Sequence, residues 1–114
     1  MNERKQAAYR ATLQGRIQDL TQEIYRLDQS GRMDEANLKK AARNIYTQCI
    51  TLLDTHGDSA AYAAQLDELS VTWRQAREMA ETHADYDRAA VEGVKLAALS
   101  EARALWEAQR EEDQ

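Results

Sequence analysis

The chain has 114 residues, a net charge of −5 and 43% hydrophobic residues, 20 of which are alanines. The absence of Pro and the presence of only four Gly argue against a β-sandwich, a barrel or a disordered linker. No apolar run approaches the ~20 residues that a bilayer span requires, and the first residues do not resemble a signal peptide. We therefore expect one soluble, cytoplasmic, all-helical domain over residues 1–114, with a frayed acidic tail from about residue 110.

The first predicted helix covers residues 3–29. Its apolar residues recur every four and three positions, which is the spacing of a helix with one buried stripe. They are Leu13, Ile17, Leu20, Ile24 and Leu27. Gly31 is expected to end this helix in the left-handed conformation, and Asp34 is expected to cap the next one.

The second predicted helix covers residues 35–55 and has an apolar stripe with the same spacing. The stripe consists of Leu38, Ala42, Ile45, Cys49 and Leu52. A further apolar face, formed by Tyr46, Ile50 and Leu53, makes this helix the candidate for the most buried element. Gly57 is expected to end it.

The third predicted helix, residues 59–83, has the most regular pattern. Its seam runs without a slip through Tyr62, Leu66, Leu69, Trp73, Ala76, Ala80 and His83. A fourth helix is predicted at 86–109, capped by Asp85 or Asp87. Because neither Gly nor Pro separates these two segments, one continuous helix about 75 Å long is the alternative.

Short turns at Gly31 and Gly57 make consecutive helices antiparallel neighbours, so the sequence predicts an antiparallel bundle, most simply of four helices. The pattern contains no phosphate-binding loop, nucleophile elbow or dinucleotide fingerprint. Neither histidine follows a Glu at the spacing used in di-iron bundles, and Cys49 lies on an apolar stripe. We therefore expect no catalytic site, no metal, no cofactor and no small-molecule substrate.

The function expected from this pattern is protein–protein interaction without catalysis, by an adaptor, a small chaperone or an assembly subunit that forms a homodimer. The candidate contacts are apolar residues expected to remain after the core is filled, namely Tyr46, Ile50, Leu53, Leu96, Leu99 and Trp106. If Trp106 is such a contact, its truncation should weaken binding and leave helicity intact.

The alternative function is nucleic-acid-associated regulation. Residues 1–57 have a net charge of +2 and residues 58–114 a net charge of −7, so any basic surface belongs to the first two helices. The candidate basic patch is Arg32, Lys39, Lys40 and Arg43. The acidic total of the chain counts against this alternative.

Overall fold

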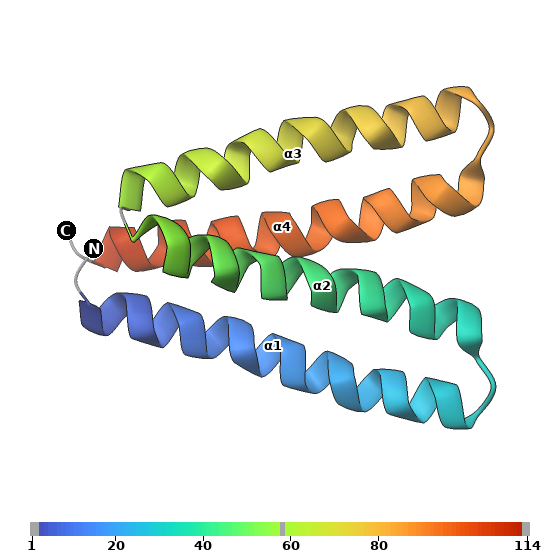
Figure 1. The fold of residues 1–114 in the computed structure, drawn as a ribbon, viewed down its shortest axis with the longest axis horizontal. Helices are drawn as coiled ribbons and strands as arrows, with labels where there is room; N and C mark the ends of the chain where they lie inside the picture. The colour runs from blue at the N-terminus through green and yellow to red at the C-terminus, as the bar shows by residue number, and fades with distance from the viewer. Residues whose placement is uncertain (1–2, 58, 113–114) are drawn as a thin grey trace.

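The computed structural model describes residues 3–57 and 59–112, and helices are the only regular secondary structure among these residues. Four helices follow one another, namely α1 (Glu3–Gln29), α2 (Met33–His56), α3 (Ser59–Thr82) and α4 (Tyr86–Glu112). Each runs antiparallel to the next (Figure 1). This confirms the all-α four-helix bundle. The alternative of one continuous helix is wrong, because the chain reverses direction between Thr82 and Tyr86.

The bundle is flattened, with extents of 44 × 34 × 22 Å, and the helices lie in the spatial order α1–α2–α4–α3 (Figure 1). Helices α2 and α4 lie side by side at the centre and run parallel to each other. Helix α2 packs against all three other helices, and so does α4, whereas the backbones of α1 and α3 do not approach each other within the described residues. The molecule is therefore two helical hairpins, α1/α2 and α3/α4, joined mainly through α2 and α4.

The two turns at the hairpin tips have the same hydrogen-bond pattern, although only one contains Gly. After α1, the amide of Arg32 donates to the carbonyl of Leu27 (2.9 Å), and Gly31 has φ 76°. After α3, the amide of Asp85 donates to the carbonyl of Ala80 (2.8 Å), and Ala84 has φ 56°. Both are Schellman terminations, so Ala84 adopts the left-handed conformation that Gly usually supplies.

The helix ends differ from the sequence expectation in two places. Arg32, not Asp34, is the N-cap of α2, because the Schellman turn ends at Arg32 and the carbonyl of Arg32 already accepts the first helical bond, from Ala36. Asp34 lies in the first helical turn. The second difference concerns the end of α4, which continues to Glu112, whereas the sequence predicted a helix that ends near residue 109. Residues 113–114 lie outside the described part of the chain.

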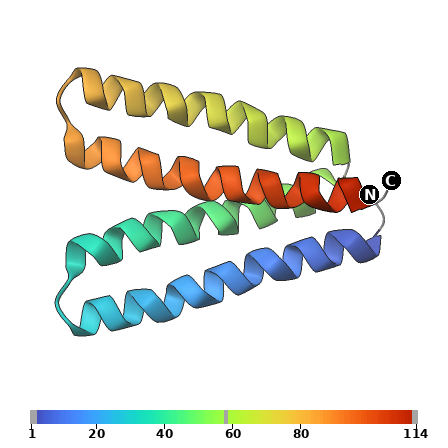
Figure 2. The same ribbon diagram turned by 180° about the vertical axis from the view of Figure 1, so that it is seen from behind.

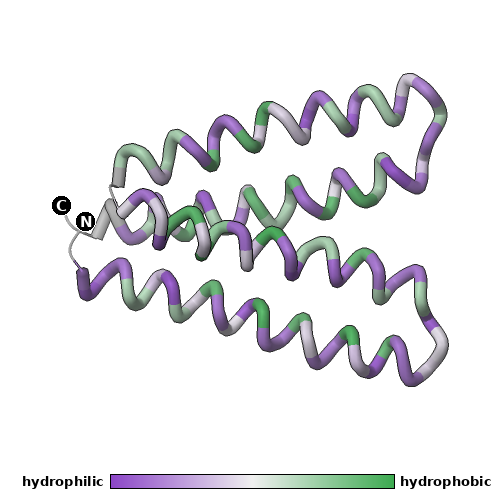
Figure 3. The backbone as a smooth tube through the Cα atoms, viewed as in Figure 1, coloured by the Kyte–Doolittle hydropathy of each residue, from purple (hydrophilic) through white to green (hydrophobic). Residues whose placement is uncertain are grey.

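The start of α4 agrees with the expectation, since the Asp85 carboxylate accepts a hydrogen bond from the backbone amide of Arg88. Polar and apolar residues alternate along all four helices (Figure 3). Within the described residues, no helix combines the length and the apolar character needed to cross a membrane.

The main buried cluster lies in one half of the bundle. We call residues 3–16, 45–57, 59–70 and 98–112 the closed half, and residues 17–44 and 71–97 the open half. All thirteen residues of the main buried cluster belong to the closed half, including Tyr9, Cys49, Tyr62 and Trp106. In the open half the two hairpins diverge, as both views show (Figures 1 and 2). Each hairpin there buries residues of its own, Ile24 and Ala36 in the first and Ala80 and Glu92 in the second.

Candidate interaction surface

The tips of the two hairpins expose large apolar side chains at the same end of the molecule. Of the five exposed large apolar residues in the described chain, four adjoin the two tip turns. Their exposed fractions are 66% for Tyr25, 51% for Met33, 66% for Met79 and 71% for Tyr86. The fifth, Val71, lies in the middle of α3. Exposed Met and aromatic side chains at one end of a molecule are typical of a surface that contacts another molecule.

Grooves adjoin these side chains. One of about 430 Å³ runs along the last turns of α3 and is lined by Ala76, Met79, Ala80 and His83, with Arg88 of α4 at its edge. A second, of about 290 Å³, lies between the first turns of α2 and α4, where Leu38 faces Ala90 and Val91. The second groove exists because the hairpins diverge here and leave the inner faces of α2 and α4 only partly covered.

The contact residues expected from sequence are mostly in the core, which corrects the expectation that they would be left over. Trp106 has no exposed surface, and Tyr46, Leu53 and Leu99 are also buried. Ile50 and Leu96 are partly buried. The physical reason is the central position of α2 and α4. Because each contacts all three other helices, its second apolar face is covered within the chain and is not left for a partner.

The closed half is built around three aromatic rings from three helices. Tyr9, Tyr62 and Trp106 contact one another edge to face, with ring centroids 4.8 to 5.9 Å apart. The Tyr9 hydroxyl lies 2.8 Å from the Tyr62 hydroxyl and donates to the carbonyl of Ala102 at 2.9 Å. These contacts join α1, α3 and α4. Burial raises the pKa of both tyrosines, so the hydroxyls stay protonated and act as hydrogen-bond donors.

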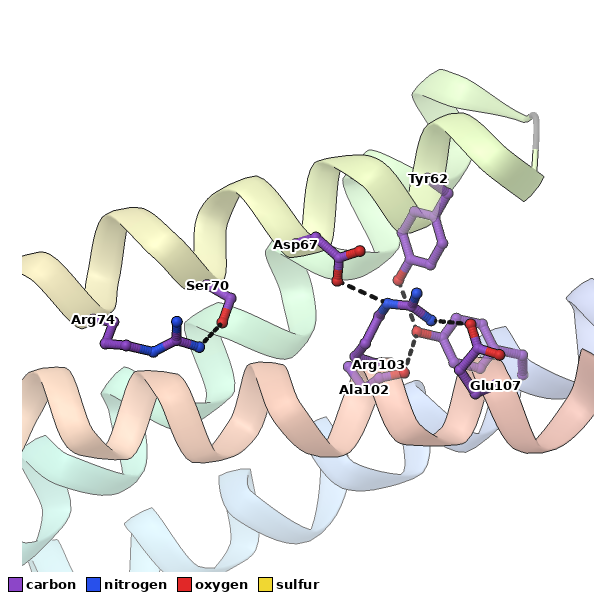
Figure 4. A network of polar contacts seen from close by, with 8 residues as sticks. Tyr62, Asp67, Ser70, Arg74, Ala102, Arg103 and Glu107 are labelled. Atoms are coloured by element: carbon purple, nitrogen blue, oxygen red, sulfur yellow. Dashed lines mark hydrogen bonds and ion pairs between the residues drawn. The ribbon is translucent and has the colours of Figure 1, made fainter.

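A second set of polar contacts lies beside the tyrosines, between α3 and α4 (Figure 4). The Arg103 guanidinium donates to Asp67 of α3 at 3.0 Å and also to Glu107 on its own helix. Nearer the middle of α3, Arg74 donates to Ser70 at 3.2 Å. These contacts lie within the second hairpin, and the one from Arg103 to Asp67 joins its two helices.

A third polar junction joins the hairpins at the middle of the bundle. The Glu101 carboxylate of α4 accepts a hydrogen bond from Arg16 of α1 (2.6 Å) and another from the Tyr46 hydroxyl of α2 (2.9 Å). The Arg16 guanidinium holds the pKa of Glu101 below its usual value, so the carboxylate stays charged at neutral pH. Burial, followed by the hydrogen bond to Glu101, raises the pKa of Tyr46. The junction therefore combines an ion pair with a buried donor.

The candidate basic patch does not form a surface of free positive charge. Lys39 lies 3.8 Å from Glu23, Lys40 lies 3.9 Å from Asp28, and Arg32 is paired with Glu35. Arg43 donates to the hydroxyl of Thr21 at 3.4 Å. Because acids lie against three of the four cations, this face has little excess charge to attract phosphates.

The described residues contain no group of three or more His, Cys, Asp or Glu side chains placed to hold a metal ion. Cys49 is buried in the core, and burial raises the pKa of its thiol to about 12. A thiol in this state is a poor nucleophile, because the thiolate is the reactive form. Cys49 therefore acts as a small apolar core residue.

No family model, no curated protein and no solved structure matches this chain. The assignment of a function therefore depends on the physical features of the surface alone.

Sequence reasoning missed the tip residues Tyr25, Met33, Met79 and Tyr86 as candidate contacts. A signal was present, because Tyr25 and Met79 lie off the apolar stripes of their helices, and Met33 and Tyr86 adjoin predicted turns. What the sequence did not indicate is that both turns lie at an end where the hairpins diverge.

Proposed function

We propose that this is a non-catalytic interaction protein of the cytoplasm, and that it acts as a homodimer formed through the open half. The observation that carries the proposal is the gathering of Tyr25, Met33, Met79 and Tyr86 at the two hairpin tips. Burying these side chains against a partner would remove the largest exposed apolar groups of the described chain from water.

A second copy is a partner that presents the same exposed apolar side chains at its own tips. In the open half, residues 17–44 carry five Lys or Arg and five Asp or Glu, and residues 71–97 carry four Lys or Arg and five Asp or Glu, so both tips are nearly neutral. If two copies meet at their open ends about a two-fold axis perpendicular to the broad face, the first hairpin of each faces the second hairpin of the other. That arrangement joins apolar tips and brings together surfaces that have little net charge to repel each other.

Sedimentation equilibrium over a wide concentration range tests this proposal. The disrupting variant is Met79→Lys combined with Tyr86→Asp. The new Lys lies in the last turn of α3 and the new Asp in the first turn of α4. Each charge interacts favourably with the dipole of its helix there, so the fold should be retained. The matched control is Val71→Lys, which places a charge at the exposed apolar residue that lies away from the tips.

We expect the native chain to form dimers reversibly, the double variant to dissociate at least tenfold more readily, and Val71→Lys to behave like the native chain. A native chain that stays monomeric at high micromolar concentration would overturn the proposal. If Val71→Lys weakened dimer formation equally, the result would place the interface at the middle of α3 and not at the tips.

A further inference from the structure

Polar contacts between the two hairpins are confined to the closed half of the described chain. They join the residue pairs Lys5–Gln109, Tyr9–Tyr62, Tyr9–Ala102, Arg16–Glu101 and Tyr46–Glu101. In the open half the ion pairs stay within one hairpin, as in Lys39–Glu23, Lys40–Asp28, Arg77–Glu81 and Lys95–Glu92. The polar contacts therefore hold the hairpins together at one end only.

Glu101 makes the inter-hairpin polar contacts that lie farthest toward the open half. These contacts are the hydrogen bonds that its carboxylate accepts from Arg16 and from Tyr46. The groove beside it is lined by Leu20 and Ala42 of the first hairpin and Val94 and Ala98 of the second. The charged groups around it from α1 are Arg16, Asp19 and Glu23. Toward the tips from this point, the polar contacts of the described residues stay within one hairpin.

Each hairpin is internally packed in the open half. Ile24 and Ala36 are buried in the first hairpin, and Ala80 and Glu92 are buried in the second. The chain passes from one hairpin to the other at the opposite end, through Gly57 with φ 58°. Two packed bodies that are joined at one end and diverge at the other have the arrangement of a hinge.

We propose that the Arg16–Glu101–Tyr46 junction is a latch that sets how far the two hairpins diverge. With the junction formed, α4 is tied to both helices of the first hairpin at mid-length. When it is broken, the hairpins hinge about the closed half and the tips separate. This inference deepens the proposed function, since separation of the tips would change the surface offered to a second copy, but it concerns the single chain.

The test measures the distance between the tips by double electron–electron resonance in dilute protein. Spin labels are attached at Gln29→Cys and Thr82→Cys, two exposed positions on different tips. A second labelled pair, Ala8→Cys and Ala64→Cys, reports on the closed half. The native Cys49 is buried and remains unlabelled, which mass spectrometry of the otherwise native chain verifies.

The latch variant is Glu101→Gln, which removes the charge and leaves an oxygen for Tyr46, and Arg16→Gln removes the other partner. The matched control is Asp54→Asn, which breaks the 3.0 Å ion pair to Arg10 within the first hairpin. Circular dichroism establishes that each variant keeps its helicity.

We expect both latch variants to shift the tip-to-tip distance to longer, broader distributions, while the closed-half pair and Asp54→Asn show the native distances. An unchanged tip distance in both latch variants would overturn the latch, and so would an equal shift in Asp54→Asn. These outcomes are distinct from failure of the proposed function, because a chain that never forms dimers can still show the opening, and a dimer can form without it.

Discussion

The hydroxyls of Tyr9 and Tyr62 lie 2.8 Å apart in the closed half, although the two residues belong to different hairpins. The pair also carries the hydrogen bond from Tyr9 to the carbonyl of Ala102. One buried hydroxyl thus serves contacts to two helices of the second hairpin.

Tyr9→Phe should lower the free energy of unfolding by about 1–3 kcal/mol, because it leaves the Tyr62 hydroxyl and the Ala102 carbonyl without this partner in a buried site. Urea denaturation measures the change. Tyr25→Phe is the control, since Tyr25 is exposed and should change stability by less than about 0.5 kcal/mol. Equal effects of the two substitutions would contradict a structural role for the Tyr9 hydroxyl.

Trp106→Ala should destabilise the chain by about 3–5 kcal/mol, because it empties a large, fully buried site between Tyr9 and Tyr62. Should the variant not fold, Trp106→Phe gives a smaller loss that urea denaturation can still measure. The half-buried Trp73 is the comparison, and Trp73→Ala should cost less. A Trp106 variant of native stability would show that the side chain is not a core residue.

Ala84→Gly should raise the free energy of unfolding by about 1 kcal/mol. A non-glycine residue in the left-handed conformation costs roughly 1–2 kcal/mol, and this gain outweighs the greater freedom that Gly gives the unfolded chain. Thermal denaturation measures it. At the exposed helical position Ala104, the same change should have the opposite sign, with a loss of about 0.5–1 kcal/mol.

The Cys49 thiol should resist a soluble disulfide reagent at pH 8 in the native state. Burial raises its pKa to about 12, so the thiolate is scarce at that pH and the reagent has no access to the sulfur. The reaction should follow unfolding and accelerate in urea. The exposed Gln29→Cys thiol is the reference for a fast reaction, and a native Cys49 that reacts at that rate would be evidence of an open core.

The number, type and order of the helices follow from the spacing of apolar residues, because a stripe such as Leu13, Ile17 and Leu20 can be buried along its length only in a helix. The turn near His83 is harder to predict, because Ala84 carries no sequence signal for a left-handed conformation. The candidate surface could not be predicted from the sequence for a different reason. Sequence periodicity indicates that a face is apolar, but it does not say how many neighbours will cover that face.

Tyr46 and Trp106 illustrate this limit. Tyr46 lies beside the stripe predicted for its helix, and Trp106 was expected among the residues left over after the core is filled. They are buried because the bundle is flattened and α2 and α4 share its centre. Packing geometry therefore determines which apolar residues remain exposed for a partner. It depends on side chains from all four helices at once, so it cannot be read from the pattern of one helix.

The spatial order α1–α2–α4–α3 also implies two kinds of folding step, namely the closure of each hairpin and the docking of the two hairpins. Each hairpin closes through a short turn, so its contacts form between residues near in sequence and are fast to find. The contacts of α2 with α4, and those of Tyr9 with Tyr62 and Trp106, close much longer loops. We therefore expect the docking of preformed hairpins to be the rate-limiting step, and we expect the aromatic rings of the closed half to be in contact in its transition state.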